Sequence, residues 1–357
     1  MFQIGIPASE VRHTDNHPTV ADDISHRRFV RGLDWRVPPR GSRFNRRLPN
    51  PRTVMAGIPP GLATALQDRY RIERELGAGG MATVYLAHDI EHDRGVALKV
   101  LNPELAKTVG ADRFKREIRV ASRLDHPNIL RVLDSGEVTD LLWFTMPYVQ
   151  GQNLNDLLQR GEPLPLPRAL AITRAVGSAL ALAHEQGVVH RDIKPENILL
   201  EGEQVMVADF GVARAVSEMH EKLTATGVIV GTPVYMSPEQ ASGEKEIDGR
   251  SDQYALASVL YEMVSGEAPF KGPTPSATLV RRFAGPPRPL RPAIDVPEAV
   301  ERAIFRALDR DPVARYPTVG DFLDALEGKA VALPAAATPS PAPPPQRRGW
   351  LGGLFGR

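Results

Sequence analysis

Two short motifs place the strongest constraint on what this chain can fold into. The segment HRDIKPEN occupies residues 190–197, and a DFG segment begins at residue 209, twelve positions after Asn197. They include one acid that can orient a hydroxyl group, and an amide and a further acid that can hold a metal, since a hard cation prefers oxygen ligands. Phosphoryl transfer needs such a set, because the protein mainly positions an attacking oxygen and neutralises phosphate charge. The two segments therefore predict a phosphotransferase in which two loops meet.

The motifs resemble the eukaryotic-like (Hanks-type) serine/threonine protein kinase family, and in particular its bacterial branch. The resemblance covers residues 70–327 and implies an α+β, bilobal protein-kinase fold. A small β-rich N-lobe with one helix is expected at about 70–147, and a larger helical C-lobe at about 150–328. Together they form a predicted kinase domain over 66–329.

By this resemblance, four residues of the motifs take part in the chemistry. Asp192 accepts or orients the proton of the substrate hydroxyl, and Lys194 offsets charge on the transferring phosphate. Asn197 and Asp209 bind Mg²⁺, with Mn²⁺ as an alternative. A single acid or amide here could instead be a turn residue, but the joint pattern is hard to explain in that way.

A glycine-rich segment, GAGGMATV at residues 77–84, resembles the phosphate-binding loop of the family, with Ala82 at the third glycine position. Glycine lets backbone amides approach phosphate where a Cβ would collide. Alone, the segment could be an ordinary tight hairpin. A dinucleotide-binding loop would need a helix directly after the glycines, whereas Thr83, Val84 and Tyr85 favour a strand.

The segment VALK at 96–99 places Lys99 on a strand that otherwise faces the core. A buried ammonium needs a partner, and the resemblance implies Glu117, on a helix predicted over 112–124. The alternatives are an exposed lysine and a weak ion pair on the helix surface. We expect a Lys99–Glu117 pair that aligns the α- and β-phosphates of ATP.

The segment MPYV at 146–149 resembles the family's adenine-binding hinge. Proline keeps its carbonyl but lacks an N–H, so Pro147 would contribute only an acceptor and Val149 would contribute its N–H. Met146 is expected to form pocket wall. The residues expected to contact ATP are Leu76, Gly77, Ala78, Gly79, Gly80, Val84, Ala97, Lys99, Met146, Pro147, Val149 and Leu199.

The segments GTP (231–233) and SPE (237–239) resemble the end of a kinase activation segment. Thr232 would contact Asp192 and Lys194 and favour Ser/Thr substrates. A buried carboxylate at Glu239 needs a cation, which the resemblance places at Arg315.

Other residues are assigned structural roles by the same resemblance. Asp252 is expected to cap a buried helix over 253–265 and to brace the catalytic loop. His190 and Phe210 are expected to pack together and tie the two loops.

Regulation is predicted from Arg191, next to the catalytic acid. Phosphate on Thr224 or Thr226 would add two negative charges and acceptor oxygens that match a guanidinium group. We expect autophosphorylation of one or both; as an alternative they are ordinary loop threonines.

The chain outside the predicted domain has a different composition. Residues 25–53 hold nine arginines and one acid, and 1–65 read as a disordered arm rich in Arg and Pro, with a translation start at Met55 as an alternative. Residues 330–357 read as an Ala/Pro-rich disordered tail. No run of eighteen apolar residues occurs, so we expect no transmembrane segment. The lack of cysteine suits a cytoplasmic protein.

The expected function is transfer of the γ-phosphate of ATP to Ser or Thr of proteins, including the chain itself. A homodimer is left open, and no nucleic-acid partner is expected, because the body of the chain is acidic on balance. The main rival is a pseudokinase scaffold, since fold alone does not imply activity. A kinase-like small-molecule phosphotransferase is a weaker alternative.

Overall fold

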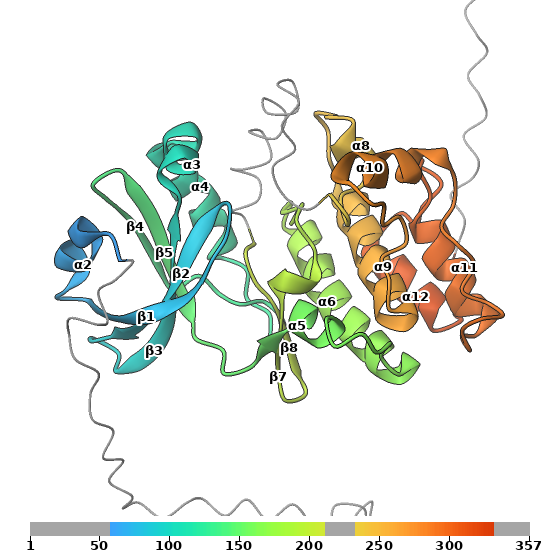
Figure 1. The fold of residues 1–357 in the computed structure, drawn as a ribbon, viewed down its shortest axis with the longest axis horizontal. Coiled ribbons are helices and arrows are strands. Elements are labelled where there is room, and N and C mark those ends of the chain that lie inside the picture. Colours follow the sequence, from blue (N-terminus) through green and yellow to red (C-terminus); the bar gives the residue numbers. More distant parts are fainter. Residues whose placement is uncertain (1–57, 211–232, 332–357) are drawn as a thin grey trace, which may run out of the picture. The chain divides into compact units, whose positions relative to one another are not determined.

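A twisted antiparallel sheet forms the N-terminal part of the described chain. The structure is a computed structural model and describes residues 58–210 and 233–331 (Figure 1). The strands run in the order β1-β2-β3-β5-β4. Their bounds are β1 (Tyr70–Ala78), β2 (Ala82–Asp89), β3 (Arg94–Leu101), β4 (Asp134–Val138) and β5 (Leu141–Pro147).

Helix α4 (Ala111–Ala121) packs on one face of this sheet, close to its predicted position. Apolar residues at helical spacing, Phe114, Ile118 and Ala121, form its buried face. The Phe114 ring lies 6.3 Å from that of Phe144 on β5. A second helix in this part, α3 (Pro103–Val109), was not predicted. Pro103 suits a helix start, because the first helical N–H has no partner inside the helix.

Helix α2 (Pro60–Leu66) corrects the predicted boundary of the N-terminal arm. Residues 60–65 were expected to be unstructured, yet Ile58, Leu62 and Leu66 are buried in a cluster with Tyr70 and Trp143. The prolines at 59 and 60 stand before the helix and at its first position, where proline starts helices rather than breaking them. The packed unit therefore begins before residue 66.

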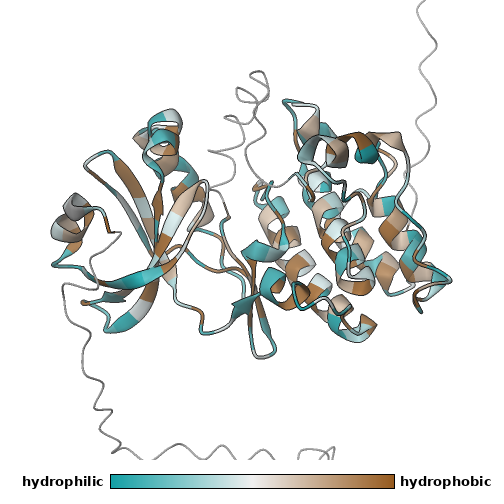
Figure 2. Cartoon of the chain, in the orientation of Figure 1, coloured by the Kyte–Doolittle hydropathy of each residue, from teal (hydrophilic) through white to brown (hydrophobic). Residues whose placement is uncertain are grey.

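Helices dominate the rest of the described chain, with a small sheet in the order β6-β7-β8 beside them. Hydrophobic and hydrophilic residues alternate along α11 and α12 (Figure 2), and the buried faces of these helices join one large core around α6 and α9. The elements are β6 (Gln152–Asn153), α5 (Leu154–Leu158), α6 (Leu166–Glu185), η1 (Pro195–Asn197), β7 (Ile198–Glu201), β8 (Gln204–Val207), α8 (Pro238–Ala241), α9 (Gly249–Ser265), α10 (Pro275–Ala284), α11 (Glu298–Ala307) and α12 (Val319–Leu326).

Helix α9 is buried along almost its whole length, as its apolar sequence predicted, but it begins earlier than expected. Its first residue is Gly249, and the side chain of Asp248 accepts a hydrogen bond from the N–H of Arg250. The prediction that Asp252 caps this helix is therefore wrong. Asp248 is the capping acid, since it directly precedes the helix in extended conformation.

Helix α6 alone, among the helices of the described ranges, is long and apolar enough to span a membrane by length and composition. Its buried residues pack against α9 and α12. The apolar composition of α6 is therefore that of a core helix.

Several predictions fall on residues outside those described. They concern the arm up to residue 57 with Met55, the tail from residue 332, and the segment 211–232 with Thr224, Thr226 and Thr232.

The packing of α2 predicts that Leu62 contributes to the stability of the folded unit. Leu62 is fully buried, so Leu62→Ala should lower the free energy of unfolding by about 2–5 kcal/mol. Chemical denaturation would measure this loss. Gln67→Ala, at the exposed end of α2, is the matched control and should change stability by less than about 0.5 kcal/mol. Equal stability of the Leu62 variant and the wild type would show that α2 does not belong to the cooperative unit.

Candidate active site

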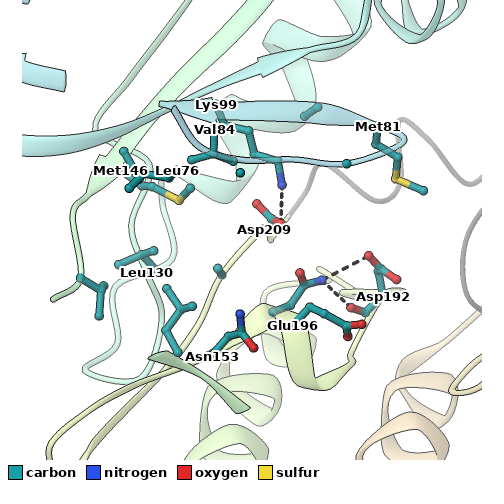
Figure 3. Close-up of a pocket in the computed structure, with 18 of the residues that line it drawn as sticks. Leu76, Met81, Val84, Lys99, Leu130, Met146, Asn153, Asp192, Glu196 and Asp209 are labelled. Atoms are coloured by element: carbon teal, nitrogen blue, oxygen red, sulfur yellow. Dashed lines mark hydrogen bonds and ion pairs between the residues drawn. The ribbon is translucent and has the colours of Figure 1, made fainter. Parts of the chain in front are cut away.

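One pocket brings together the residues that the motifs predicted. It has a volume of about 640 Å³, within the range of small-molecule sites. All twelve residues expected to contact ATP line it, and so do Asp192, Lys194, Asn197 and Asp209 (Figure 3). Glu117 is not among the lining residues. Segments more than a hundred residues apart in sequence thus converge on one cavity.

The pocket also has walls that the motifs did not predict. Glu196 and Ala208 belong to or adjoin the predicted motifs, so their place follows from their neighbours. The same holds for Met81, Ala82 and Tyr148, which lie inside the glycine-rich and hinge segments. No motif pointed to Leu101, Leu105, Leu130 and Asn153, whose positions depend on tertiary packing. The unpredicted lining residues are Met81, Ala82, Leu101, Leu105, Leu130, Tyr148, Asn153, Glu196 and Ala208.

The glycine-rich loop is the turn between β1 and β2, followed by a strand as expected. The N–H of Gly79 donates to the carbonyl of Ala82 over 2.9 Å. A Cβ added at Gly77 or Gly80 would meet no atom within 4 Å. The surrounding protein therefore does not itself require glycine at these positions, and the space that they leave opens on the pocket.

The hinge accommodates Pro147 through the register of β5 against β3. The N–H of Tyr148 donates to the carbonyl of Gly95, and Pro147 lies opposite Val96. Because hydrogen-bonded and non-hydrogen-bonded pairs alternate in an antiparallel ladder, Val96 and Pro147 form a non-hydrogen-bonded pair. The missing N–H of proline therefore costs the sheet no hydrogen bond, and its carbonyl is directed away from β3.

Lys99 contacts Asp209 rather than its predicted partner. The Lys99 Nζ lies 2.5 Å from Asp209 Oδ2, and the described residues include no Lys99–Glu117 ion pair. The predicted pair is therefore wrong for this conformation. The side chains of Lys99 and Asp209 are both largely buried, with 17% and 15% of their surface exposed, so each charge removes the cost of burying the other.

The ion pair with Lys99 fixes the charge state of Asp209. Burial acts to raise the pKa of Asp209, but the charge and hydrogen bond of Lys99 outweigh it and lower the pKa. Asp209 is thus ionised at neutral pH. Its other oxygen, Oδ1, is buried and has no hydrogen-bond partner among the residues that the structure describes.

This arrangement fits a divalent cation. A buried carboxylate oxygen without a partner is the donor that a hard cation requires, and Asn197 lines the same pocket. The Asn197 amide group donates through Nδ2 to the Asp192 carbonyl at 2.8 Å, so its own oxygen is not used in that bond. No group of three His, Asp or Glu that could hold a metal occurs in the described ranges. A cation here would need further oxygens, as from phosphate and water.

Asp192 lines the pocket on the side of the catalytic loop, where two neighbouring side chains orient its carboxylate. Lys194 Nζ donates to Asp192 Oδ2 at 2.7 Å, and Asn197 Nδ2 lies 3.2 Å from the same oxygen. Burial acts to lower the pKa of Lys194, but the charge of Asp192 outweighs it and raises the pKa. Lys194 therefore carries its positive charge beside the acid.

The catalytic loop is held by Asp252 of α9, as predicted. Its carboxylate accepts the backbone N–H of His190 at 2.8 Å and that of Arg191 at 2.7 Å. His184 contacts the same carboxylate at 2.7 Å. Arg191 has a φ of +67°. This backbone conformation is energetically unfavourable for any residue other than glycine. The two hydrogen bonds compensate for that strain.

The predicted contact between the two loops is confirmed. The rings of His190 and Phe210 lie 4.6 Å apart, edge to face. His190 Nε2 also lies 2.9 Å from the carbonyl of Ala208. Asp209, which follows, has a φ of +70°, so these contacts lie directly before and after a residue in a strained backbone conformation.

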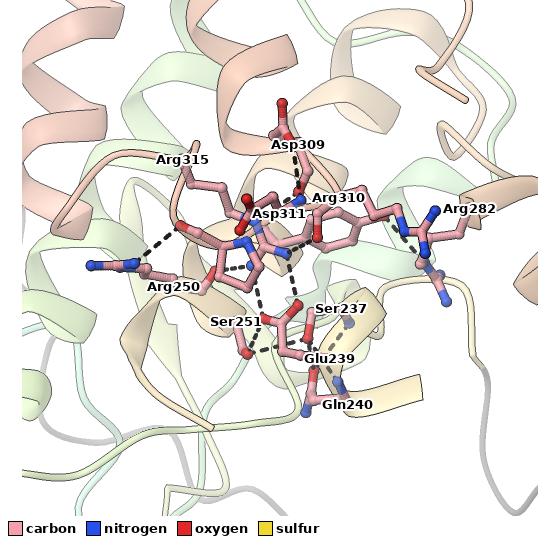
Figure 4. A network of polar contacts seen from close by, with 12 residues as sticks. Ser237, Glu239, Gln240, Arg250, Ser251, Arg282, Asp309, Arg310, Asp311 and Arg315 are labelled. Carbon is pink, nitrogen blue, oxygen red and sulfur yellow. Dashed lines mark hydrogen bonds and ion pairs between the residues drawn. The ribbon is translucent and has the colours of Figure 1, made fainter. Parts of the chain in front are cut away.

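The predicted Glu239–Arg315 ion pair is confirmed and lies deep in the helical part (Figure 4). Arg315 donates through both terminal nitrogens, at 2.8 and 2.7 Å, in a bidentate arrangement. Ser251 donates to the same carboxylate. Burial acts to raise the pKa of Glu239, but the hydrogen bonds and charge of Arg315 outweigh it and lower the pKa.

A buried arginine next to this network was not predicted. Arg282 of α10 donates through Nη2 to the carbonyls of Pro233 and Val234, at 2.5 and 2.9 Å, and its Nε lies 3.2 Å from the Tyr254 hydroxyl. It thereby fixes the first described residues after the segment 211–232 against α9 and α10.

The protein kinase domain family matches this chain over residues 70–316, more than half of its length. The serine/threonine-protein kinase pkn2 of Myxococcus xanthus is 38% identical over 293 residues, which are 78% of this chain and 35% of that protein. The serine/threonine-protein kinase PrkC of Bacillus subtilis is 41% identical over 260 residues, 72% of this chain and 40% of that protein. This chain thus spans less than half the length of these relatives.

A solved structure shows the same fold. The PknI kinase domain of Mycobacterium tuberculosis matches with a TM-score of 0.58 and 33% identity, over 72% of this chain and 94% of that one. With the site geometry above, these findings establish that the chain belongs to the protein kinase domain family.

The burial of the Glu239–Arg315 pair predicts that its loss lowers the free energy of unfolding much more than the loss of an exposed pair. Arg315→Met should lower the free energy of unfolding by about 3–5 kcal/mol, because it leaves a buried carboxylate without its cation. Arg302→Met, which removes an exposed ion pair with Glu298 on α11, is the matched control and should cost less than about 1 kcal/mol. Denaturant titration of both variants would test this. Equal losses would mean that burial does not set the strength of the pair.

Proposed function

We propose that this chain is an ATP-dependent serine/threonine protein kinase, which transfers the γ-phosphate of ATP to hydroxyl groups of proteins. The observation that carries the proposal is the convergence of Lys99, Asp192, Asn197 and Asp209 on one pocket beneath the glycine-rich loop. The curated relatives are named serine/threonine kinases, which supports the choice of acceptor residue.

In this proposal, the reaction forms a bond between the acceptor oxygen and the γ-phosphorus and breaks the bond from that phosphorus to the bridging oxygen, which leaves with ADP. The Asp192 carboxylate orients the hydroxyl group and takes up its proton. Lys194, held at 2.7 Å from Asp192, offsets charge on the phosphoryl group in transit. Lys99 binds the α- and β-phosphates from the other side of the pocket.

Magnesium is the cation proposed for this site, with manganese as an alternative. The residues that would hold it are Asp209, through its unpartnered Oδ1, and Asn197. When bound, the ion supplies positive charge next to the β- and γ-phosphates. For ATP, support also comes from a kinase structure, Rad53 in complex with AMP-PNP, which matches with a TM-score of 0.62 and 25% identity over 73% of this chain.

The alternative is a pseudokinase, which would bind partners without transferring phosphate. All four polar groups that the reaction requires lie in the pocket, and a binding module would not need an ionised Asp209 with an unpartnered buried oxygen. The geometry therefore favours an enzyme. A cytoplasmic location stays a prediction of the sequence, and a homodimer stays open.

Replacing the proposed base tests the mechanism. Asp192→Asn should lower the rate of phosphate transfer by about 10²–10⁴-fold, the usual contribution of a positioned base, and should leave AMP-PNP affinity nearly unchanged. Transfer of labelled γ-phosphate to a generic acceptor protein would measure the rate. Asp125→Asn, at an exposed acid paired with Arg131, is the control and should retain full activity. A wild-type protein that binds AMP-PNP but transfers no phosphate would support the pseudokinase instead.

Autophosphorylation is proposed at Thr224, Thr226 or both, which lie outside the described residues. A phosphate on either could reach Arg191, whose backbone is fixed by Asp252, and form charge-assisted hydrogen bonds with its guanidinium group.

Mass spectrometry after incubation with ATP and Mg²⁺ should show phosphate on this segment in the wild type and none in Asp192→Asn. Thr224→Ala/Thr226→Ala should then lower the rate of transfer to other proteins. An active preparation with both threonines unmodified would refute this regulatory proposal and leave the kinase activity standing.

A further inference from the structure

The tip of the glycine-rich loop is fixed from outside by one residue, Asn102. Its side-chain Nδ2 donates to the carbonyl of Gly80 at 2.8 Å and lies 3.3 Å from that of Gly79. Its backbone N–H donates to the carbonyl of Met81 at 2.9 Å. Three consecutive carbonyls of the turn thus point to one asparagine at the end of β3.

Asn102 stands where asparagine usually caps a helix, but its side chain bonds to the loop instead. Asn102 is the residue before α3, with extended backbone, where asparagine is among the best helix caps. Its side chain nevertheless makes no capping hydrogen bond. Pro103, which follows, lacks an N–H, so one of the donors that usually await a partner at a helix start is missing. The side chain is directed to the loop instead.

The loop has reason to need such an anchor. A turn rich in glycine has many accessible conformations, and fixing it costs more entropy than fixing other residues. Gly77 and Gly80 have open space where a Cβ would be, so packing around them does little to restrain the turn. Near the tip, Met81 packs beside the cluster that includes Leu101 and Leu105, and Val84 packs there from β2.

Asn102 also links the loop to the lysine of the site. It directly follows β3, which carries Lys99, and β2 pairs with β3 so that Val84 lies opposite Lys99. Because the tip is bonded to Asn102, its position relative to the Lys99 ammonium group is fixed. Both groups would act on the same part of a nucleotide, its phosphates.

We propose that Asn102 is a positioning residue that latches the glycine-rich loop and thereby sets affinity for the phosphates of the nucleotide. This inference rests on the proposed function, since it concerns the same pocket. The proposal predicts a difference that a general role in stability does not. The binding affinity of nucleotides that carry phosphates should depend on Asn102, whereas that of adenosine should not.

The test replaces Asn102 with aspartate. Asn102→Asp keeps the size of the side chain and a good capping group, but it removes the donor and turns a carboxylate oxygen toward the loop carbonyls. The dissociation constant of AMP-PNP with Mg²⁺ should rise about 3- to 10-fold, the value of roughly one net hydrogen bond. The dissociation constant of adenosine should change less than about 2-fold. Asn102→Ala should behave similarly.

Thr108→Ala is the matched control on the same helix. Within the described ranges its hydroxyl donates to the Glu104 carbonyl in α3 and to no other group, and both dissociation constants should match the wild type. Equal weakening of AMP-PNP and adenosine, or no change in either, would overturn the latch.

Hydrogen exchange supplies a readout without any nucleotide. The Gly79 amide, bonded to the Ala82 carbonyl, should exchange faster in Asn102→Asp than in the wild type, with an unchanged melting temperature. An unchanged exchange rate would also count against the latch. If Asn102→Asp shows both the exchange and the affinity effect relative to the wild type, but the wild type transfers no phosphate, the kinase activity alone would be refuted. Wild-type protein that does not bind AMP-PNP would refute both proposals.

Discussion

The carboxylate of Asp252 is the interaction on which the site depends most. It lies in α9, which is buried along nearly its whole length, and it accepts two consecutive backbone N–H groups of the catalytic loop. Burial acts to raise the pKa of Asp252, but the hydrogen bond and charge of His184 and the His190 amide outweigh it and lower the pKa. An ionised acceptor with this many donors can hold Arg191 in its strained backbone conformation. The geometry of Asp192 then follows from its neighbour in sequence.

Helix α9 connects this loop to the rest of the helical core through its other polar residues. Ser251 donates to Glu239, which Arg315 holds in a bidentate pair. Gln253 donates to the carbonyls of Tyr316 and Thr318, so that it fixes the segment before α12. Three consecutive buried residues of one helix thus form hydrogen bonds with three different segments: α8, the catalytic loop and the segment before α12. Each polar group has a partner, which is the condition for burying it without a large loss of stability.

The sequence predicted those parts of the fold and site that depend on local pattern. Lys99, Asp192, Asn197 and Asp209 were found because the motifs have fixed spacing, and helix α4 because its apolar residues recur at helical intervals. The partner of Lys99 was predicted wrongly, because the choice between Glu117 and Asp209 depends on how β3, α4 and the segment with Asp209 lie in space, which the local pattern does not contain. Helix α2 was missed because prolines were interpreted as signs of disorder. Asn102 could not have been found, since its role depends on where a distant turn lies.

The two sides of the pocket are therefore held in place by different kinds of interaction. On the side of the helical core, charged side chains hold strained residues such as Arg191 and Asp209 in place. On the side of the sheet, a turn with little packing of its own is held by backbone carbonyls and a single amide side chain. Between them, Asp209 keeps one oxygen paired with Lys99, and its other oxygen is buried with no partner in the described part of the chain. An unsatisfied buried oxygen costs about 1–3 kcal/mol. That cost would be recovered if the cation proposed for this site bound the free oxygen.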